Sequence, residues 1–225
     1  MSNPILIPRC ILELHPLATD PDGDRHNLSC IYITRTEQAV TNGHQLVKLE
    51  TELEDLDQQF DRVPSKSVSL PVSVVQAILK GSKKDTKGKG QGSIFQLEII
   101  SESNVKLTRI NPDGSTITLQ FDTCEYGKFP DYNQCMPTSK EKKFSRFWDD
   151  SNPQIGFNLE LTQPVFEYLK RIKANTICGF KFIDDLSPIL STQEFDAEPW
   201  NVQDDESFAL ASKLTWLLMP CRVTP

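Results

Sequence analysis

Carboxylates in an early turn are the first residues whose type and spacing suggest chemistry. The run Asp20-Pro21-Asp22-Gly23-Asp24 is similar to the start of a calcium-binding loop. An EF-hand loop needs Gly at its sixth position and Glu at its twelfth. Counted from Asp20, those positions hold Arg25 and Ile31. The run is therefore interpreted as an acidic turn.

A lysine- and glycine-rich segment between Ser82 and Ser93 suggests phosphate binding. It carries Lys83, Lys84, Lys87 and Lys89 among three glycines. A nucleotide-binding loop has the pattern Gly-x-x-x-x-Gly-Lys-Ser/Thr and leads into a helix, whereas this segment leads into a strand-like run. Two interpretations remain, a solvated hairpin loop or a loop that contacts DNA phosphates without reading sequence.

His44, together with Asp131 or Asp184, would make an acid–base pair for hydrolysis. No nucleophile motif, metal-ligand spacing or phosphate loop accompanies these residues. We therefore expect a protein that is not an enzyme, with no catalytic residues and no cofactor or metal. A hydrolytic enzyme stays the third and least favoured hypothesis.

Six cysteines are spread along the chain without a Cys-x-x-Cys pair or a histidine at zinc-ligand spacing. No basic region followed by a long apolar run opens the sequence, and no apolar stretch reaches the length of a membrane span. We therefore expect reduced, mostly buried thiols in a cytoplasmic protein, rather than disulfides. No membrane partner is expected.

The chain has 225 residues, 38% of them hydrophobic, which is enough for one large or two small domains with their own cores. The formal net charge is −7, which excludes a simple basic protein that coats nucleic acid. Contact with DNA through a local basic strip stays open, because net charge does not say where the charges lie.

Hydrophobic periodicity predicts many short strands and two helices. One order, a strand, a helix and then three strands, occurs over Ser67–Pro137 and again over Gly156–Val223. This repetition predicts an α+β fold with helices on one face of antiparallel sheets. The expected helices are Pro71–Leu79 and a helix from Thr162 to about Lys173. The expected strands are Ile5–Leu14, Asn27–Thr34, Gln45–Glu50, Ser67–Leu70, Ile94–Ile100, Asn104–Ile110, Ser115–Phe121, Gly156–Leu161, Thr176–Asp184, Pro188–Gln193 and Leu214–Val223, with an acidic loop over Glu194–Glu206.

Three motifs that lie far apart resemble segments of one family. A Thr-Asp-Gly-His-Arg-Leu turn of the family is similar to Thr41-Asn42-Gly43-His44-Gln45-Leu46. A segment that closes one of its domains is similar to Phe129-Pro130-Asp131-Tyr132 through Met136-Pro137. Its Met-Pro-Met-Arg-Leu ending is similar to Leu218-Met219-Pro220-Cys221-Arg222-Val223. Shorter matches between them keep the same order. The family is the bacterial β sliding clamp, the β subunit of DNA polymerase III.

The resemblance implies a shortened, DNA-clamp-like fold. Residues 1–137 resemble the middle domain of the clamp without its first helix. Residues 138–154 are expected to be a linker, and residues 155–225 resemble the second half of the last domain. Nothing in the chain corresponds to the first domain of the clamp.

In the β clamp, a groove between the middle and last domains binds short linear peptides of polymerases, the clamp loader and repair proteins. The resemblance implies an apolar groove with a few polar groups that orient the peptide. Three residues depart from the family pattern: Gln45 in place of an Arg, Gln134 where a basic residue is common, and Cys221 in place of a Met. They imply a changed peptide preference. The alternative is that these segments are simply a turn and a core strand. The groove would be lined by Thr41, Gly43, His44, Leu46, Pro130, Cys135, Ser187, Leu217, Met219, Pro220, Cys221 and Arg222.

The resemblance also implies contact with double-stranded DNA, through phosphates and without sequence specificity. The alternative is that cations at helix C-termini stabilise the helix dipole. The candidate DNA-contact residues are Lys80, Lys83, Lys84, Lys170, Arg171 and Lys173.

Two non-catalytic functions follow from the resemblance. The first is a processivity factor or docking platform of DNA replication or repair, which binds clamp-binding peptides and assembles as a homo-oligomer. The second is a degenerate relative that does not encircle DNA and instead sequesters or regulates clamp-binding proteins.

Overall fold

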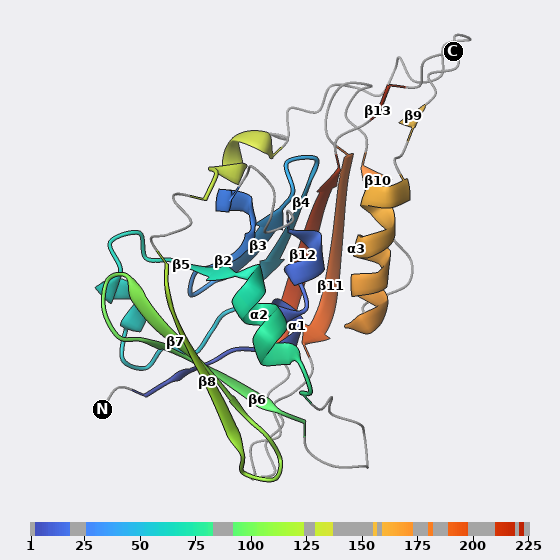
Figure 1. The fold of residues 1–225 in the computed structure, drawn as a ribbon. Coiled ribbons are helices and arrows are strands. Elements are labelled where there is room, and N and C mark those ends of the chain that lie inside the picture. The colour runs from blue at the N-terminus through green and yellow to red at the C-terminus, as the bar shows by residue number, and fades with distance from the viewer. Residues whose placement is uncertain are drawn as a thin grey trace, which may run out of the picture.

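The fold is α+β, with antiparallel sheets and few helices (Figure 1). It was obtained as a computed structural model that describes residues 3–18, 26–82, 92–123, 129–136, 155–156, 159–172, 180–181, 189–197, 210–218 and 221–222. A four-stranded sheet has the order β1 (Ile5–Leu6), β6 (Ile94–Ile99), β7 (Asn104–Ile110), β8 (Thr116–Asp122). A seven-stranded sheet has the order β10 (Phe180–Lys181), β11 (Ile189–Ala197), β12 (Leu210–Leu218), β4 (Gln45–Glu50), β3 (Glu37–Thr41), β2 (Cys30–Ile33), β5 (Val68–Pro71). A small ladder joins β13 (Cys221–Arg222) to β9 (Ile155–Gly156).

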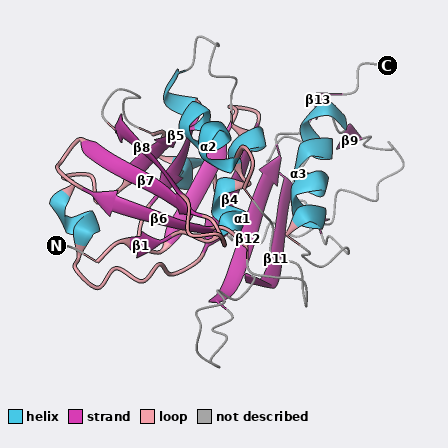
Figure 2. Ribbon diagram, turned by 60° about the horizontal axis from the view of Figure 1, so that its bottom comes forward, coloured by secondary structure: helices cyan, strands magenta, loops and turns pink. Residues whose placement is uncertain are grey.

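Within the described residues there are three α-helices, and each follows the first strand of a group of strands. They are α1 (Arg9–Leu12), α2 (Val72–Leu79) and α3 (Leu159–Arg171). Figure 1 shows them in front of the seven-stranded sheet, and in Figure 2 the strands β6, β7 and β8 lie on one side of α2, with β11, β12 and α3 on the other. Short 3-10 helices are η1 (His15–Leu17), η2 (His26–Leu28), η3 (Gln59–Arg62) and η4 (Tyr132–Cys135).

Strand pairing interlocks the groups. The opening strand β1 pairs with β6, and β5 pairs with β2, so each opening strand belongs to the sheet of the other group. β12 pairs with β4 over six residues, which places strands from the two ends of the chain in one sheet. The two predicted domains therefore share a sheet, and their division at residues 138–154, outside the described residues, stays a prediction.

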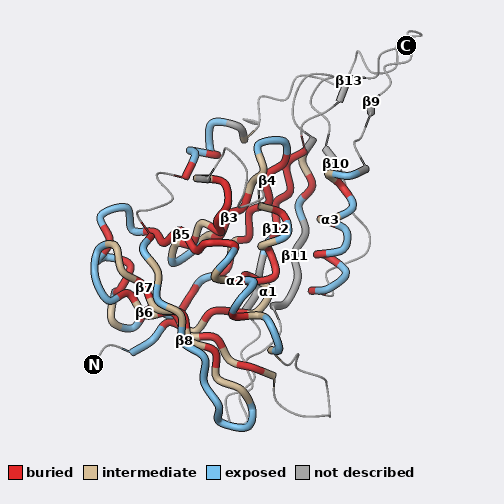
Figure 3. Tube along the Cα trace, in the orientation of Figure 1, coloured by how far each residue is buried: buried red, intermediate tan, exposed pale blue. Residues whose placement is uncertain are grey.

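The main core lies between the helices and the sheets (Figure 3). In α2, Val72, Val75 and Ile78 are buried, at the spacing of one helix face. In α3 the buried face carries Tyr168, whose hydroxyl donates to the Cys10 carbonyl at 3.0 Å. This bond joins α3 to α1, because Cys10 belongs to α1.

The prediction of a strand over Ile5–Leu14, with no helix in the opening segment, is wrong. The strand ends at Leu6, and α1 and η1 follow it. Pro8 takes the N-cap of α1 and Pro16 an early position of η1. Proline lacks the backbone donor that a strand interior needs and fits the first turn of a helix.

Three further differences concern element ends. The strand β3 lies in a segment for which none was predicted, because the turn before it is held by the Thr34 side chain rather than by Gly or Pro. Helix α3 begins at Leu159, so the strand expected over Gly156–Leu161 is wrong from Leu159 onward, and Thr162 lies inside the helix. Strand β11 runs on to Ala197, into the expected acidic loop.

Several expectations fall on residues that the structure does not describe. They include the acidic run Asp20–Asp24, most of the lysine-rich loop and the linker 138–154. Within the described residues, no helix has both the length and the apolar character that a bilayer span requires. Cys10 and Cys30 are free thiols. The side chains of the other four cysteines lie outside the described part of the structure.

Candidate functional site

Three segments that are distant in the sequence meet on the face of the seven-stranded sheet that is turned away from the helices. β4 sends Val47 and Leu49 into the main core and Leu46 to the opposite face, because successive strand residues alternate. Leu46 is the register partner of Leu217 on β12. We call the group on this face the outer cluster. Its buried members are Cys30, Ala39, Leu46, Phe129, Tyr132 and Leu217, and Tyr32, Met136 and Leu190 pack against them half-buried.

Aromatic rings cover the strands of the outer cluster. Tyr32 and Phe129 are stacked, with ring centroids 4.9 Å apart and an interplanar angle of 18°. Tyr132 meets both rings edge-on, at 6.3 and 6.2 Å. Phe129 and Tyr132 flank Pro130, which is exposed. The predicted groove lining included Pro130 and Cys135 but none of these three aromatic residues, although Phe129 and Tyr132 flank Pro130 in the quoted motif.

The turn between β3 and β4 forms one rim of the outer cluster. The Thr41 hydroxyl donates to the Gln45 carbonyl at 2.6 Å and accepts from the Gly43 backbone N–H at 3.1 Å. The Asn42 side-chain oxygen accepts from the backbone N–H of His44 and of Gln45, each at 3.0 Å. Gly43 has φ +86°, a conformation that favours glycine. The His44 side chain is exposed.

The structure places two of the twelve predicted groove residues, Leu46 and Leu217, in the outer cluster. Thr41 is the register partner of Leu46, and Gly43 and His44 belong to the turn between them. Pro130 directly follows Phe129 in the chain, and Cys135 belongs to η4, where nothing is described of its side chain. Cys221 and Arg222 form β13, and nothing is described of their side chains. Ser187, Met219 and Pro220 lie outside the described residues.

An ionic network lies next to the outer cluster and crosses from β4 to β12. Lys48 Nζ is 3.2 Å from a Glu37 carboxylate oxygen and 3.1 Å from one of Glu50. The other Glu50 oxygen is 3.3 Å from Lys213 Nζ on β12. The Tyr132 hydroxyl donates to Glu37 at 2.7 Å. Burial and the Glu37 carboxylate raise the pKa of Tyr132, which holds the phenol in its protonated, donating form.

The carboxyl group of Glu50 makes the seam between β4 and β12 sensitive to acid. Burial alone raises its pKa, but the hydrogen bonds and charges of Lys48 and Lys213 outweigh burial and lower the pKa below its ordinary 4.5. A carboxyl whose folded-state pKa is depressed stabilises the fold above its unfolded-state pKa. That contribution is lost as the pH falls through the lower, folded-state value.

We therefore expect Glu50→Gln to reduce stability at pH 7 and to flatten the acid limb of the stability curve below about pH 4.5. Urea unfolding from pH 7 to pH 3 measures both effects. Glu52→Gln is the matched control, because Glu52 is 68% exposed and its ion-pair partner among the described residues is the exposed Arg35. Parallel curves for the wild type and Glu50→Gln below pH 5 would contradict the expectation.

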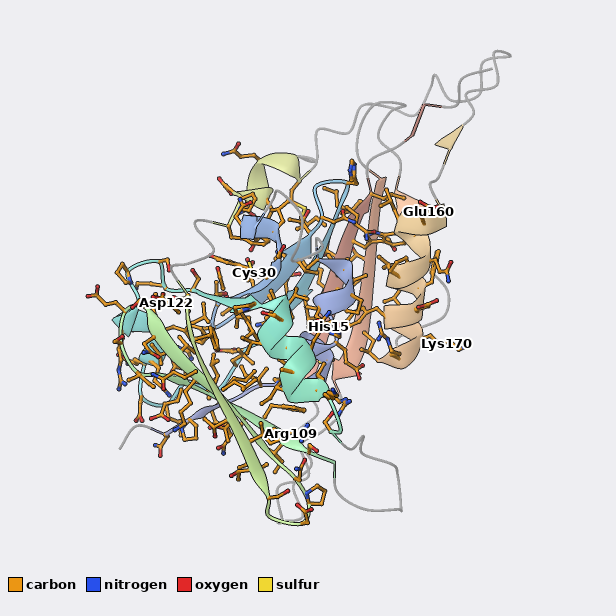
Figure 4. The ribbon with its side chains drawn as sticks, viewed as in Figure 1. His15, Cys30, Arg109, Asp122, Glu160 and Lys170 are labelled. Carbon is orange, nitrogen blue, oxygen red and sulfur yellow. The ribbon has the colours of Figure 1, made fainter. Side chains whose placement is uncertain are left out.

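The candidate DNA-contact residues are divided between described and undescribed segments. Lys80 follows α2 as its C-cap, and Lys170 and Arg171 end α3, all three of them exposed. Figure 4 shows Lys170 and Glu160 at opposite ends of α3. Lys83, Lys84 and Lys173 lie outside the described residues. Both interpretations of the three described cations, phosphate contact and dipole stabilisation, fit their positions.

The acid–base pair considered for hydrolysis draws on residues of the outer-cluster rim. The Asp131 carboxylate accepts from the Asn133 backbone N–H at 3.2 Å and from the Gln134 side-chain nitrogen at 3.1 Å, both within its own turn. Asp184 lies outside the described residues. Among the described residues, no group of three or more His, Cys, Asp and Glu side chains is arranged to hold a metal ion.

Comparison with known proteins gives no family assignment. No protein-family model matches the chain, and no curated protein matches it. The function is therefore inferred from the geometry of the outer cluster and from the motifs that form it.

Proposed function

We propose that this chain is a non-catalytic, clamp-like docking protein that binds short peptides with Leu or Phe anchors at the outer cluster. The observation that carries the proposal is the pairing of Leu46 with Leu217 under Phe129 and Tyr132. Residues of two motifs that resemble the β sliding clamp, Leu46 of one and Phe129 and Tyr132 of the other, thereby meet in one apolar site. Leu217, which directly precedes the third motif, lies in the same site. Chance motif matches would have no reason to converge.

The element order supports a clamp-like fold. A strand, a helix and three strands occur as β1, α1, β2–β4, again as β5, α2, β6–β8 and a third time as β9, α3, β10–β12. The first two groups exchange their opening strands, and the third extends the sheet of the first through β12. One helix follows the opening strand of each group. We propose that these groups are repeats of a clamp-type processivity fold.

The outer cluster has the features of a peptide site with an apolar interior and a polar rim. Leu46 and Leu217 are only 5% and 3% exposed, so an anchor side chain enters by displacing the half-buried side chains above them. Met136 is the adaptable member, because an unbranched thioether changes its rotamer at little cost. His44 on the rim then donates to, or accepts from, the peptide backbone.

Isothermal titration calorimetry of the full chain with a Gln-x-x-Leu-Phe peptide tests the proposal. We expect a dissociation constant of roughly micromolar order, equivalent to about −8 kcal/mol, and no binding of the same peptide with Ala-Ala in place of Leu-Phe. His44→Ala should weaken binding about fivefold, the value of one net hydrogen bond, while Gln76→Ala on the exposed face of α2 should not. The absence of binding at millimolar peptide would overturn the proposal.

Two roles remain for such a docking protein, and circular DNA separates them. A ring that retains circular but not linear DNA, with strong salt dependence, supports a processivity factor. Peptide affinity without DNA retention supports the alternative, a clamp relative that sequesters or regulates clamp-binding proteins. The acidic net charge of −7 opposes binding to DNA phosphates, so the second role stands beside the first.

A further inference from the structure

The strand β8 presents a long free edge. Among the described residues, no strand pairs with its outer side, and it forms one end of the four-stranded sheet. The other described edges are short, with two residues in β1 and β10 and four in β5, which ends on Pro71. β8 has seven residues, mostly exposed, and none of them is Lys, Pro or Gly, the residues that usually protect an edge.

Hydrogen bonds at both ends of the β7–β8 ladder fix which backbone groups face the free edge. Asn111 N–H donates to the Ser115 carbonyl at 2.9 Å, and Thr123 N–H donates to the Ser103 carbonyl at 2.8 Å. Because hydrogen-bonded pairs alternate with non-bonded pairs, the odd-numbered residues of β8 bond to β7. The N–H and C=O groups of the even-numbered residues therefore point outward. They belong to Thr116, Thr118, Gln120 and Asp122.

The sequence of β8 is complementary to itself in the antiparallel direction. A two-fold axis at Leu119 pairs Ile117 with Phe121 of the second copy and brings the two Leu119 side chains together. It pairs Thr118 with Gln120 and Thr116 with Asp122, so every outward backbone group meets another outward group. Asp122 is the only charge and lies opposite a threonine.

Other registers fit less well. An axis between two residues would set outward groups against groups already bonded to β7. An axis at Thr118 or Gln120 keeps the correct alternation but pairs only five of the seven residues of β8. The axis at Leu119 is the one that uses the whole strand.

We propose that β8 is a self-association edge, through which two copies of this chain pair antiparallel about Leu119. The four-stranded sheets then form one continuous eight-stranded sheet, with α2 of both copies on the same face. The pairing covers Ile117, which is 39% exposed, and the half-buried Leu119 and Phe121. In Figure 1 the β7–β8 hairpin extends away from the seven-stranded sheet, so the outer cluster stays open in the dimer. This inference is independent of the peptide-docking function.

Sedimentation equilibrium of the full chain measures the association. We expect a monomer–dimer equilibrium with a dissociation constant of roughly 10–100 µM, because a seven-residue edge buries less than the ~1,200 Å² of a standard interface. A monomer at concentrations up to about a millimolar would overturn the proposal, and so would a trimer or larger ring.

Two double variants at the same exposed positions test the register. Thr118→Lys with Gln120→Lys places like charges opposite each other and should weaken the dimer at least tenfold. Thr118→Glu with Gln120→Lys makes each cross-strand pair opposite in charge and should dimerise at least as well as the wild type. Gln120→Pro removes an outward N–H without removing a bond to β7 and should also abolish the dimer. Equal dimerisation of both double variants, with thermal unfolding unchanged, would overturn the proposed pairing.

Discussion

Trp216→Ala is expected to destabilise the protein by about 3–5 kcal/mol, the usual cost of truncating a buried tryptophan. Trp216 on β12 is 1% exposed and lies between Val47 of β4 and Ser191 of β11 in the sheet register. Its ring meets Phe166 of α3 edge-on, with centroids 5.5 Å apart and an interplanar angle of 83°. The substitution removes the side chain that holds the C-terminal strands and α3 together.

Differential scanning calorimetry and urea unfolding measure this loss. For a chain of this length the midpoint should fall by roughly 6–20 °C. Phe166→Ala is the matched control, because Phe166 is 44% exposed and shares the same ring contact. It should cost about 0.5–1.5 kcal/mol beyond its small area term. Equal effects of the two substitutions would show that the ring contact, rather than burial of Trp216, dominates.

Arg109→Ala is expected to cost about 3–5 kcal/mol, because two charge-assisted hydrogen bonds are lost and two carbonyls lose their donor. Arg109 on β7 is 4% exposed, and its Nη1 donates to the carbonyls of Ile78 at 2.8 Å and of Lys80 at 2.6 Å. These carbonyls end α2, where a cation also stabilises the helix dipole. One side chain thus satisfies the end of α2 and joins it to the four-stranded sheet.

Urea unfolding at pH 7 provides the measurement, and Arg109→Lys provides the comparison. Lysine keeps the charge but not the planar guanidinium, so it should recover only part of the loss. Arg62→Ala tests specificity, because Arg62, within the part of the chain that the structure describes, makes one long hydrogen bond, to the Ile99 carbonyl at 3.5 Å. A cost below about 1 kcal/mol for Arg109→Ala would contradict the role, since unpaired helix-end carbonyls alone cost more than that.

Elements with strong local signals could be predicted from the sequence. Strands β4 and β7 have the predicted bounds, because alternation and the flanking Asn-Gly and Pro-Asp-Gly turns define them. Helix α2 begins one residue after its predicted start, since Pro71 stays in β5 and caps the helix. These segments need little information from the rest of the chain.

Elements fixed by distant contacts could not be predicted. The segment Ile5–Leu14 is apolar enough for a strand, but it packs against both sheets and forms the helix α1 over Arg9–Leu12. Apolar runs do not distinguish a buried strand from a buried helix. Strand β11 extends into an acidic segment because β12 pairs with it over nine residues, including Glu194 and Asp196.

The candidate site was partly accessible to sequence reasoning. Leu46 could be named because it lies in one quoted motif, and Leu217 because it directly precedes another. Their direct pairing required the register of β4 and β12. The aromatic residues Tyr32, Phe129 and Tyr132, and the ionic network beneath Tyr132, depend on side-chain packing across four segments. No local pattern encodes such contacts.

The pairing of β4 with β12 has a consequence for synthesis of the protein. About 160 residues separate the two strands, so at 5–20 residues per second the free side of β4 waits roughly ten to thirty seconds for its partner. Lys48 and Glu50 lie along that side, and charges on a strand edge discourage pairing with other nascent chains. The charges of Lys48 and Glu50 therefore protect the unpaired edge of β4 until β12 is made, and Glu50 then also pairs with Lys213.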